Sequence, residues 1–129
     1  MQPVEDRASF PVQERIKSSL AIKAVMDEKK HVSSFPIKCF YRIVPKTDAA
    51  TQLAVVASKR RFKHAVDRNR IKRLMREAYR LNKHTISLPE GLTLQMCWIY
   101  VSGELPDAQS MMAAAAKVFS KIQSAIAES

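Results

Sequence analysis

Glycine and cysteine are both scarce in this sequence, with two of each among 129 residues, and the six prolines are dispersed. This composition excludes a glycine-rich linker and low-complexity sequence, and no internal repeat is visible. The two cysteines, Cys39 and Cys97, lie in separate apolar stretches, without a CxxC motif or a histidine at metal-ligand spacing. We therefore expect buried, reduced thiols, with neither a disulfide nor a metal bound by the protein.

Long apolar runs are also absent. No uncharged apolar segment reaches the roughly 18 residues of a membrane span, and the opening MQPVEDR is acidic where a secretory signal would be basic and then apolar. These absences argue against a membrane partner and favour a cytoplasmic protein. With 47% hydrophobic and 26% charged residues, the composition is that of one globular domain. We expect this domain in residues 15–129, after an N-terminal extension, residues 1–14, that is a candidate for disorder.

Acidic residues are nearly missing from one window of the sequence. Residues 59–84 contain eleven of the 22 lysines and arginines but only Asp67 and Glu77 as acids, a net charge of +9. Residues 1–58 carry +3 and residues 85–129 carry −2. A concentrated basic surface attracts polyphosphates, because each neutralised phosphate releases counterions. Nucleic acid is therefore the predicted partner, and an ordinary solvated helix face is the simpler alternative.

The apolar pattern predicts an alternation of helices and strands. Three segments have the helical period, residues 20–30, 64–83 and 107–127. Three segments have strand character, residues 35–44, 52–57 and 92–101, and a further short strand is expected around residues 31–34. Ser18 or Ser19, and Asp107, are candidate N-caps. This order predicts an α+β fold, a single-domain sandwich in which helices pack on a mixed sheet of about four strands.

The second and third of the main predicted strands flank the basic helix. If they are neighbours in the sheet, the helix between them makes them parallel, and such a crossover is ordinarily right-handed.

The predicted helix at residues 64–83 separates apolar from cationic side chains. At 100° per residue, one face holds the apolar residues Ile71, Leu74, Met75, Ala78 and Leu81. The opposite face holds Asn69 among six cations, namely Arg70, Lys72, Arg73, Arg76, Arg80 and Lys83. Only Glu77 can form an intrahelical ion pair there, with Arg73 or Arg80. Phosphates would supply the missing counter-charges, and a helix N-terminus near residues 67–70 would add backbone N–H donors.

The segment SKRRFKHAVDRNRIKRLMREAYR, residues 58–80, resembles the signature of the bacterial ribonuclease P protein component. The resemblance implies a small basic subunit that binds a catalytic RNA and precursor tRNA, in a ribonucleoprotein that removes the 5′ leader of the tRNA by hydrolysis. It also implies that Mg²⁺ is held mainly by the RNA, that the protein has no catalytic residues and no small-molecule substrate, and that it is a monomer in the holoenzyme. The crossover through the basic helix is left-handed in this family.

Carried over to this sequence, the resemblance assigns two groups of site residues. The predicted RNA-binding residues are Lys59, Arg60, Arg61, Lys63, Arg68, Asn69, Arg70, Lys72, Arg73, Arg76 and Arg80. The leader cleft would be formed by Ile22 and Met26 on the first helix and Phe40 on the next strand. The family commonly has phenylalanines on that helix, so only Phe40 keeps a ring for base stacking, and core packing is an equally good reading of it. The family's glycine after the helix is replaced by Glu28-Lys29-Lys30, so the turn there has to be made without a residue that adopts positive φ easily.

Three other readings of the basic window stay open. A nuclease acting alone would need carboxylates or histidines that converge, and the candidates are His64, Asp67, Glu77 and His84. Asp67 is more simply a helix N-cap or a partner of the helix dipole. A general RNA- or DNA-binding module, or a domain that binds acidic proteins, would use the same cations without any linked reaction.

Overall fold

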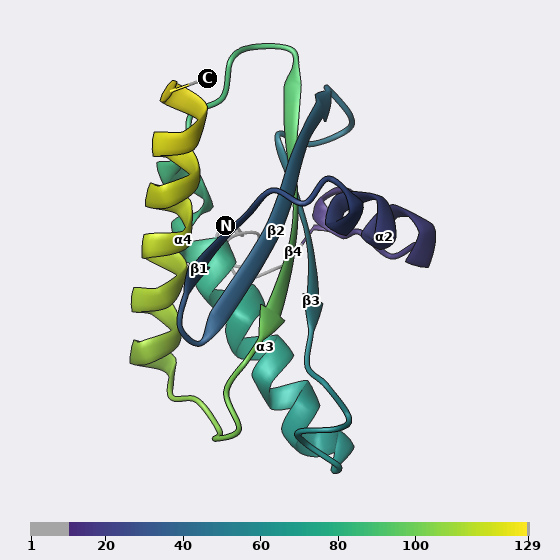
Figure 1. The fold of residues 1–129 in the computed structure, drawn as a ribbon, viewed down its shortest axis with the longest axis vertical. Coiled ribbons are helices and arrows are strands. Elements are labelled where there is room, and N and C mark those ends of the chain that lie inside the picture. Colours follow the sequence, from purple (N-terminus) through teal and green to yellow (C-terminus); the bar gives the residue numbers. More distant parts are fainter. Residues whose placement is uncertain (1–10, 129) are drawn as a thin grey trace, which may run out of the picture.

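A mixed four-stranded sheet carries the helices in the computed structural model, which describes residues 11–128 (Figure 1). The strands are β1 (His31–Ser34), β2 (Ile37–Pro45), β3 (Thr51–Val56) and β4 (Leu92–Tyr100). The helices are α2 (Ser19–Asp27), α3 (Ala65–Asn82) and α4 (Ala108–Glu128), with short 3-10 turns η1 (Val12–Glu14) and η2 (Lys83–Thr85). The strand order is β1-β2-β4-β3. The predicted α+β class, the mixed sheet and the short strand at residues 31–34 are confirmed.

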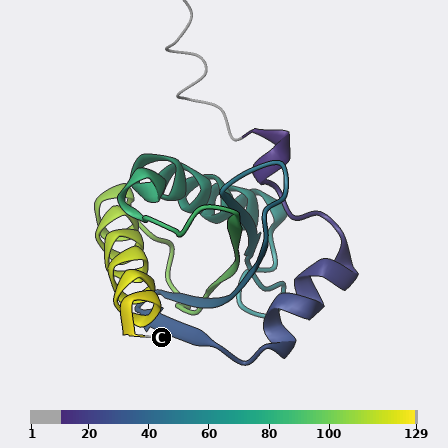
Figure 2. The same cartoon turned by 90° about the horizontal axis from the view of Figure 1, so that it is seen from above.

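The basic helix α3 connects the two parallel strands. β3 and β4 pair in parallel, with Thr51 opposite Leu94 and Val56 opposite Ile99, whereas β2 pairs antiparallel with both β1 and β4. In Figures 1 and 2 the path from β3 through α3 to β4 is left-handed. The ordinary right-handed expectation is therefore wrong for this chain, and the handedness implied by the resemblance is the observed one.

Helices α3 and α4 cover one face of the sheet, and the main core lies between them and the strands (Figure 2). Its centre is a group of three rings. The ring centroid of Trp98 from β4 lies 6.1 Å from that of Tyr79 of α3 and 5.8 Å from that of Phe119 of α4, and both pairs are edge to face. All three side chains are almost completely buried. Such ring pairs stabilise a fold by more than the burial of their apolar surface alone, so they hold α3 in a defined position on the sheet.

Helix α2 packs on the opposite face of the sheet. Ser18 is its N-cap, and its hydroxyl accepts hydrogen bonds from the backbone N–H groups of Leu20 and Ala21. Val25 is completely buried against Ala54 and Cys97. The helix ends at Asp27, three residues before the predicted end.

The turn after α2 contains a residue other than glycine with positive φ. Lys29 has φ 63°, the left-handed conformation that glycine adopts most easily. The chain must reverse between α2 and β1 over only three residues, Glu28, Lys29 and Lys30. The tight connection therefore imposes positive φ on a lysine.

The buried face of α3 is rotated from the predicted one. Ile71, Met75 and Ala78 are buried as expected, and Leu74 packs at the margin of the core. Leu81 instead is 40% exposed. Tyr79 and Asn82 take the remaining buried positions, and Asn82 donates from its amide to the carbonyl of Ala78 at 2.9 Å. α4 approaches α3 from the Tyr79 side, so the contact with α4 decided which flank of the apolar stripe is covered.

The strands and the last helix lie close to their predicted places. β2 begins at Ile37, because Phe35 and Pro36 form the turn from β1 and proline has no N–H to donate to a strand. Leu53 and Ala54 of β3 are both buried, so this strand is covered on both faces as its apolar run predicted. Asp107 caps α4: its carboxylate accepts a 2.7 Å hydrogen bond from the N–H of Ser110.

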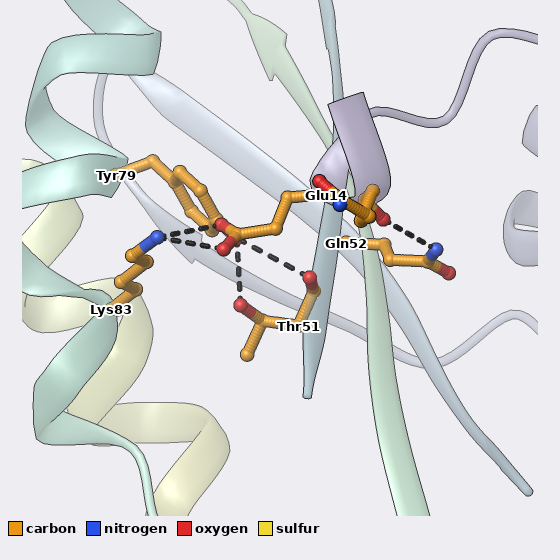
Figure 3. Close-up of polar contacts among 6 residues, drawn as sticks. Glu14, Thr51, Gln52, Tyr79 and Lys83 are labelled. Carbon is orange, nitrogen blue, oxygen red and sulfur yellow. Dashed lines mark hydrogen bonds and ion pairs between the residues drawn. The ribbon is translucent and has the colours of Figure 1, made fainter. Parts of the chain in front are cut away.

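The segment before α2 is attached to the domain. Tyr79 donates its hydroxyl hydrogen to Glu14 at 2.5 Å, and Lys83 donates to both oxygens of the same carboxylate at 2.8 Å (Figure 3). Gln52 donates from its side chain to the carbonyl of Gln13 at 2.9 Å. Residues 11–14 of the predicted extension thus pack on the domain, and residues 1–10 lie outside the described residues.

Candidate RNA-binding surface

The basic loop before α3 is anchored by one aromatic side chain. Phe62 is 7% exposed and its ring lies 6.0 Å from that of Tyr100 at the end of β4. Its N–H also donates to the carbonyl of Ser58 at 3.0 Å. The four cations around Phe62 are all exposed, namely Lys59, Arg60, Arg61 and Lys63. Burial of the ring therefore fixes the loop and turns its charges to the surface.

Arg68 fastens this loop to the first turn of α3. One of its guanidinium nitrogens, Nη1, donates to the carbonyl of Phe62 at 2.8 Å and to that of Lys63 at 3.0 Å. The side chain is half-buried, unlike the exposed cations beside it. Arg68 thus has a structural task in addition to its positive charge, which the sequence pattern alone did not show.

The outer face of α3 carries the remaining predicted contacts. Asn69, Arg70 and Arg73 are exposed, and Lys72 and Arg76 are half-buried. Within residues 11–128, no side-chain hydrogen bond or ion pair engages these five residues. Their donors are therefore available to a ligand.

Arg80 differs from the other predicted contacts. It pairs with Glu77 at 2.6 Å, one of the two pairings expected from the sequence, and its side chain is only 16% exposed. Lys83, on the same predicted face, is occupied by Glu14. The accessible cationic stripe is therefore shorter than the helix and ends near Arg76.

The N-terminus of α3 lies within one residue of the predicted start at residue 64, and therefore before residues 67–70, where free backbone N–H groups were expected. The helix begins at Ala65 with His64 as the N-cap residue, and the His64 side chain makes no capping hydrogen bond. The backbone N–H groups of Asp67 and Arg68 both donate to the carbonyl of His64. Asp67 is a first-turn acid that suits the helix dipole, and it is not the cap. The expected N–H donors at residues 67–70 are thus partly used within the helix.

The predicted cleft residues gather on the α2 face of the sheet. Ile22, Met26 and Phe40 all pack at the margin of the small cluster formed by Val25, Ala54 and Cys97. Each of the three is half-buried, so each leaves part of its apolar surface accessible. Phe40 is flanked by Lys38, whose Nζ lies 5.1 Å from the ring centroid. The structure thus brings together the three residues assigned from the resemblance.

A cavity of about 290 Å³ joins the cleft side to the cationic helix. Ile22 and Arg76 both line it, although α2 and α3 lie on opposite faces of the sheet. Two further cations line it, Arg15 and Lys17, from the segment that connects η1 to α2. Neither residue was among the predicted contacts, and their signal in the sequence is two basic residues within three positions of a helix N-cap.

Three cations and no acid are among the residues that line this cavity. Burial lowers the pKa of the Arg76 guanidinium, and the neighbouring Arg15 cation lowers it further. An anion bound beside Arg76 would stabilise the charged form of its guanidinium. Arginine also matches the oxygens of a phosphate with two parallel hydrogen bonds. The cavity is therefore suited to an anionic ligand.

The candidates for protein-based nuclease chemistry do not converge. His64 and His84 flank the two ends of α3, an 18-residue helix that is about 27 Å long. Glu77 is used by Arg80. Across residues 11–128, no group of three or more histidine, cysteine, aspartate or glutamate side chains could hold a metal ion.

The two thiols are free and buried, as predicted, but on opposite faces of the sheet: Cys39 in the main core and Cys97 under α2. Burial raises the pKa of both thiols, so neither is an activated nucleophile.

None of the helices in the described part of the chain is long and apolar enough to cross a membrane.

Comparison with known proteins points to one family. The family model for ribonuclease P matches residues 10–123. The chain is 38% identical over 113 residues to a ribonuclease P protein component from Porphyromonas gingivalis, covering 84% of this chain and 82% of that one. It is 34% identical over 102 residues to the protein component from Chlorobium phaeobacteroides, covering 70% of each.

Solved structures with the same fold include two bacterial RNase P proteins. The protein from Staphylococcus aureus aligns with a TM-score of 0.67 at 19% identity, over 85% of this chain and 95% of that one. The protein from Thermotoga maritima aligns with a TM-score of 0.67 at 20% identity, over 84% and 96%. The family match covers most of the chain, and these structures share its sheet and helices. The chain belongs to the ribonuclease P protein family.

Proposed function

We propose that this chain is the protein subunit of a ribonuclease P holoenzyme, which removes the 5′ leader of precursor tRNA. In this proposal the exposed cations of α3 and of the loop at residues 59–63 bind the catalytic RNA. The face formed by α2 and the sheet holds the single-stranded leader. The observation that carries the proposal is that the cations of α3 up to Arg76 have no acidic partner within residues 11–128.

The two surfaces are continuous, which supports a ligand that contacts both. The cavity lined by Ile22 and Arg76 lies between the apolar cleft and the basic helix. A precursor tRNA bound near the catalytic RNA would have phosphates close to the helix and unpaired leader bases close to the cleft. Exposed bases bind apolar and aromatic surfaces, whereas phosphates bind arginine and lysine.

Hydrolysis in this proposal is performed by the RNA subunit, with Mg²⁺ held mainly by RNA. The protein binds, orients and neutralises charge. Its lysines and arginines raise the affinity for the substrate. They also lower the Mg²⁺ concentration that the ribonucleoprotein needs, because these side chains and Mg²⁺ neutralise the same phosphates.

Reconstitution tests this proposal. The purified chain is added to a bacterial ribonuclease P RNA and a precursor tRNA at low Mg²⁺, and accurate 5′ cleavage is the expected result. Cleavage by the chain without the RNA, or no effect of the chain on the RNA, would contradict the proposal. Binding to many RNAs without rescue of cleavage would favour a general RNA-binding module.

A charge reversal identifies the docking face. Arg70→Glu is preferable to a change of Arg68, because the Arg70 side chain is exposed and has no hydrogen-bond partner in the described chain, whereas Arg68 holds the basic loop. The expected result is loss of holoenzyme assembly with an unchanged circular dichroism spectrum. Lys117→Glu on α4, also exposed, is the matched control and is expected to assemble normally. Equal behaviour of the two variants would show that α3 is not the docking element.

A further inference from the structure

The edge strand β1 extends the row of residues to which Phe40 belongs. His31 pairs with Phe40, Phe40 with Cys97, and Cys97 with Ala54, so one row runs across all four strands on the α2 face. Cys97 and Ala54 are buried beneath Val25 of α2. Phe40 is half-buried and His31 is exposed. Helix α2 therefore covers the half of the row on β4 and β3, and the half on β2 and β1, with Phe40 and His31, stays accessible to solvent.

The open half of the row consists of two rings in contact. The ring centroids of His31 and Phe40 lie 5.7 Å apart, with the ring planes at 48°. Lys38, two residues from Phe40 and on the same face of β2, places its ammonium 5.1 Å from the Phe40 centroid. Neither Lys38 nor His31 makes a side-chain hydrogen bond or ion pair with any residue from 11 to 128. Their polar atoms are thus left for a ligand beside an accessible aromatic surface.

The charge around the two rings favours an anionic ligand. Lys29 and Lys30, directly before His31, are both exposed. Of the two acids that precede them, Asp27 is paired with Lys23 at 3.0 Å, which leaves Glu28 against the three lysines. Aromatic rings bordered by lysines suit single-stranded nucleic acid, in which unpaired bases stack and adjacent phosphates bind cations. A duplex presents no unstacked base to such a surface.

We infer that His31 is a substrate-positioning residue: together with Phe40 and Lys38 it binds one nucleotide of the single-stranded 5′ leader. The base stacks on the paired rings and its phosphate contacts Lys38. This inference rests on the proposed function, because it takes precursor tRNA as the substrate, and it deepens that function by adding a contact on β1. Ile22 and Met26 contribute apolar surface but no ring, so His31 and Phe40 supply the aromatic area of this face.

The test measures binding of the reconstituted holoenzyme to a precursor tRNA with a short single-stranded leader and to the mature tRNA. His31→Ala is expected to bind the precursor about tenfold more weakly and the mature tRNA as the unchanged protein does. His31→Phe, which keeps a ring, is expected to retain most of the affinity. Ser33→Ala is the matched control, since Ser33 is exposed and lies on the same face of the same strand.

Three outcomes would overturn the inference. Unchanged binding of the precursor by His31→Ala would remove the contact, and equal weakening for precursor and mature tRNA would show that the leader is not its ligand. Losses that add fully in the His31→Ala, Phe40→Ala double variant would show that the rings do not form one surface. In all three cases the assembly experiments with Arg70→Glu would still stand. Failure of the unchanged holoenzyme to prefer the precursor would instead overturn leader binding as a whole.

Discussion

Lys83 at the end of α3 donates hydrogen bonds of 2.8 Å to both carboxylate oxygens of Glu14 in η1. The two side chains are 29% and 15% exposed, and the Tyr79 hydroxyl donates to the same carboxylate (Figure 3). This contact attaches the segment that also carries Arg15 and Lys17 to the domain. It therefore links the stability of the fold to the placement of two candidate phosphate ligands.

Glu14→Gln should lower the free energy of unfolding by about 2 kcal/mol, because it leaves a partly buried ammonium without its counter-charge. Urea unfolding measures the loss. Glu77→Gln is the control, since the Glu77 side chain is 49% exposed in its pair with Arg80, and its loss should stay below about 1 kcal/mol. Equal losses for the two variants would show that the Glu14 contact does not anchor the segment.

Lys29→Gly should stabilise the protein slightly, by about 0.5 kcal/mol. Lys29 holds φ 63°, which costs an L-residue roughly 1 kcal/mol, and glycine recovers this cost less its larger entropy in the unfolded chain. The midpoint of urea unfolding measures the change. Lys30→Gly, where φ is not positive, should destabilise instead, and stabilisation by both substitutions would contradict the explanation.

Stability should fall at alkaline pH, in part through Cys97. Burial raises the pKa of this thiol from 9.0 to about 11. Between these values the folded protein keeps a proton that the unfolded chain has released, so the stabilisation is complete below pH 9 and is lost as the pH rises toward 11. The loss attributable to the thiol is about 1.4 kcal/mol per pH unit.

Comparison with Cys97→Ala isolates this contribution. The variant should unfold more easily at every pH because of the missing side chain, but its free energy of unfolding should decline less steeply between pH 9 and 11. Burial also raises the pKa of Tyr41 and Tyr100, and this contribution is present in both proteins. Parallel curves for the two proteins would show that the buried thiol does not contribute.

The salt dependence of binding to the catalytic RNA should report which cations contact phosphate. Arg73→Gln is expected to weaken binding. It should also make the negative slope of log K against log salt shallower by about 0.7–0.9, the effect of one lost phosphate contact. Arg80→Gln should leave the slope nearly unchanged, because Arg80 is paired with Glu77 and only 16% exposed. Titrations at several salt concentrations measure both, and the reverse order would place the RNA on the other flank of α3.

Phe40→Ala should weaken binding of precursor tRNA more than binding of mature tRNA. The ring is half-buried, so its exposed part is available for stacking while the rest packs near Met26 and Cys97. Base stacking on a ring is worth roughly 1–3 kcal/mol. Phe40→Leu separates the two roles, because it keeps apolar packing and loses the ring. Equal effects on both tRNAs would assign Phe40 to the core alone.

Periodicity in the sequence predicted the elements and the strand-helix order, and the charge pattern indicated where the candidate site lies. Helix α3 and the strands on either side of it lie close to their predicted bounds, because their apolar patterns are long and uninterrupted. Local signals also limited the cap of α2 to Ser18 or Ser19, of which Ser18 is the observed one, and placed the cap of α4 at Asp107, since capping depends only on residues a few positions away.

Tertiary contacts decided what periodicity left open. The approach of α4 buried Tyr79 and Asn82 and left Leu81 exposed, although all three border the same apolar stripe. Lys83 pairs with Glu14 of η1, and Arg68 donates a hydrogen bond to the carbonyl of Phe62 in the basic loop. Both cations look equivalent to Arg70 in the sequence, but their side chains make contacts within the fold. Strand pairing placed His31 against Phe40 across nine residues of sequence.

One physical reason separates what the sequence determined from what the tertiary structure decided. Amphipathic order and net charge are properties of neighbouring residues along the chain, so the sequence alone determined that this protein has a cationic helix backed by an apolar sheet. Which of those cations stay available, and which rings meet on the open face, depends on segments that become neighbours only after folding. The positions of Glu14 and His31 beside residues distant in the sequence were therefore settled by the tertiary structure.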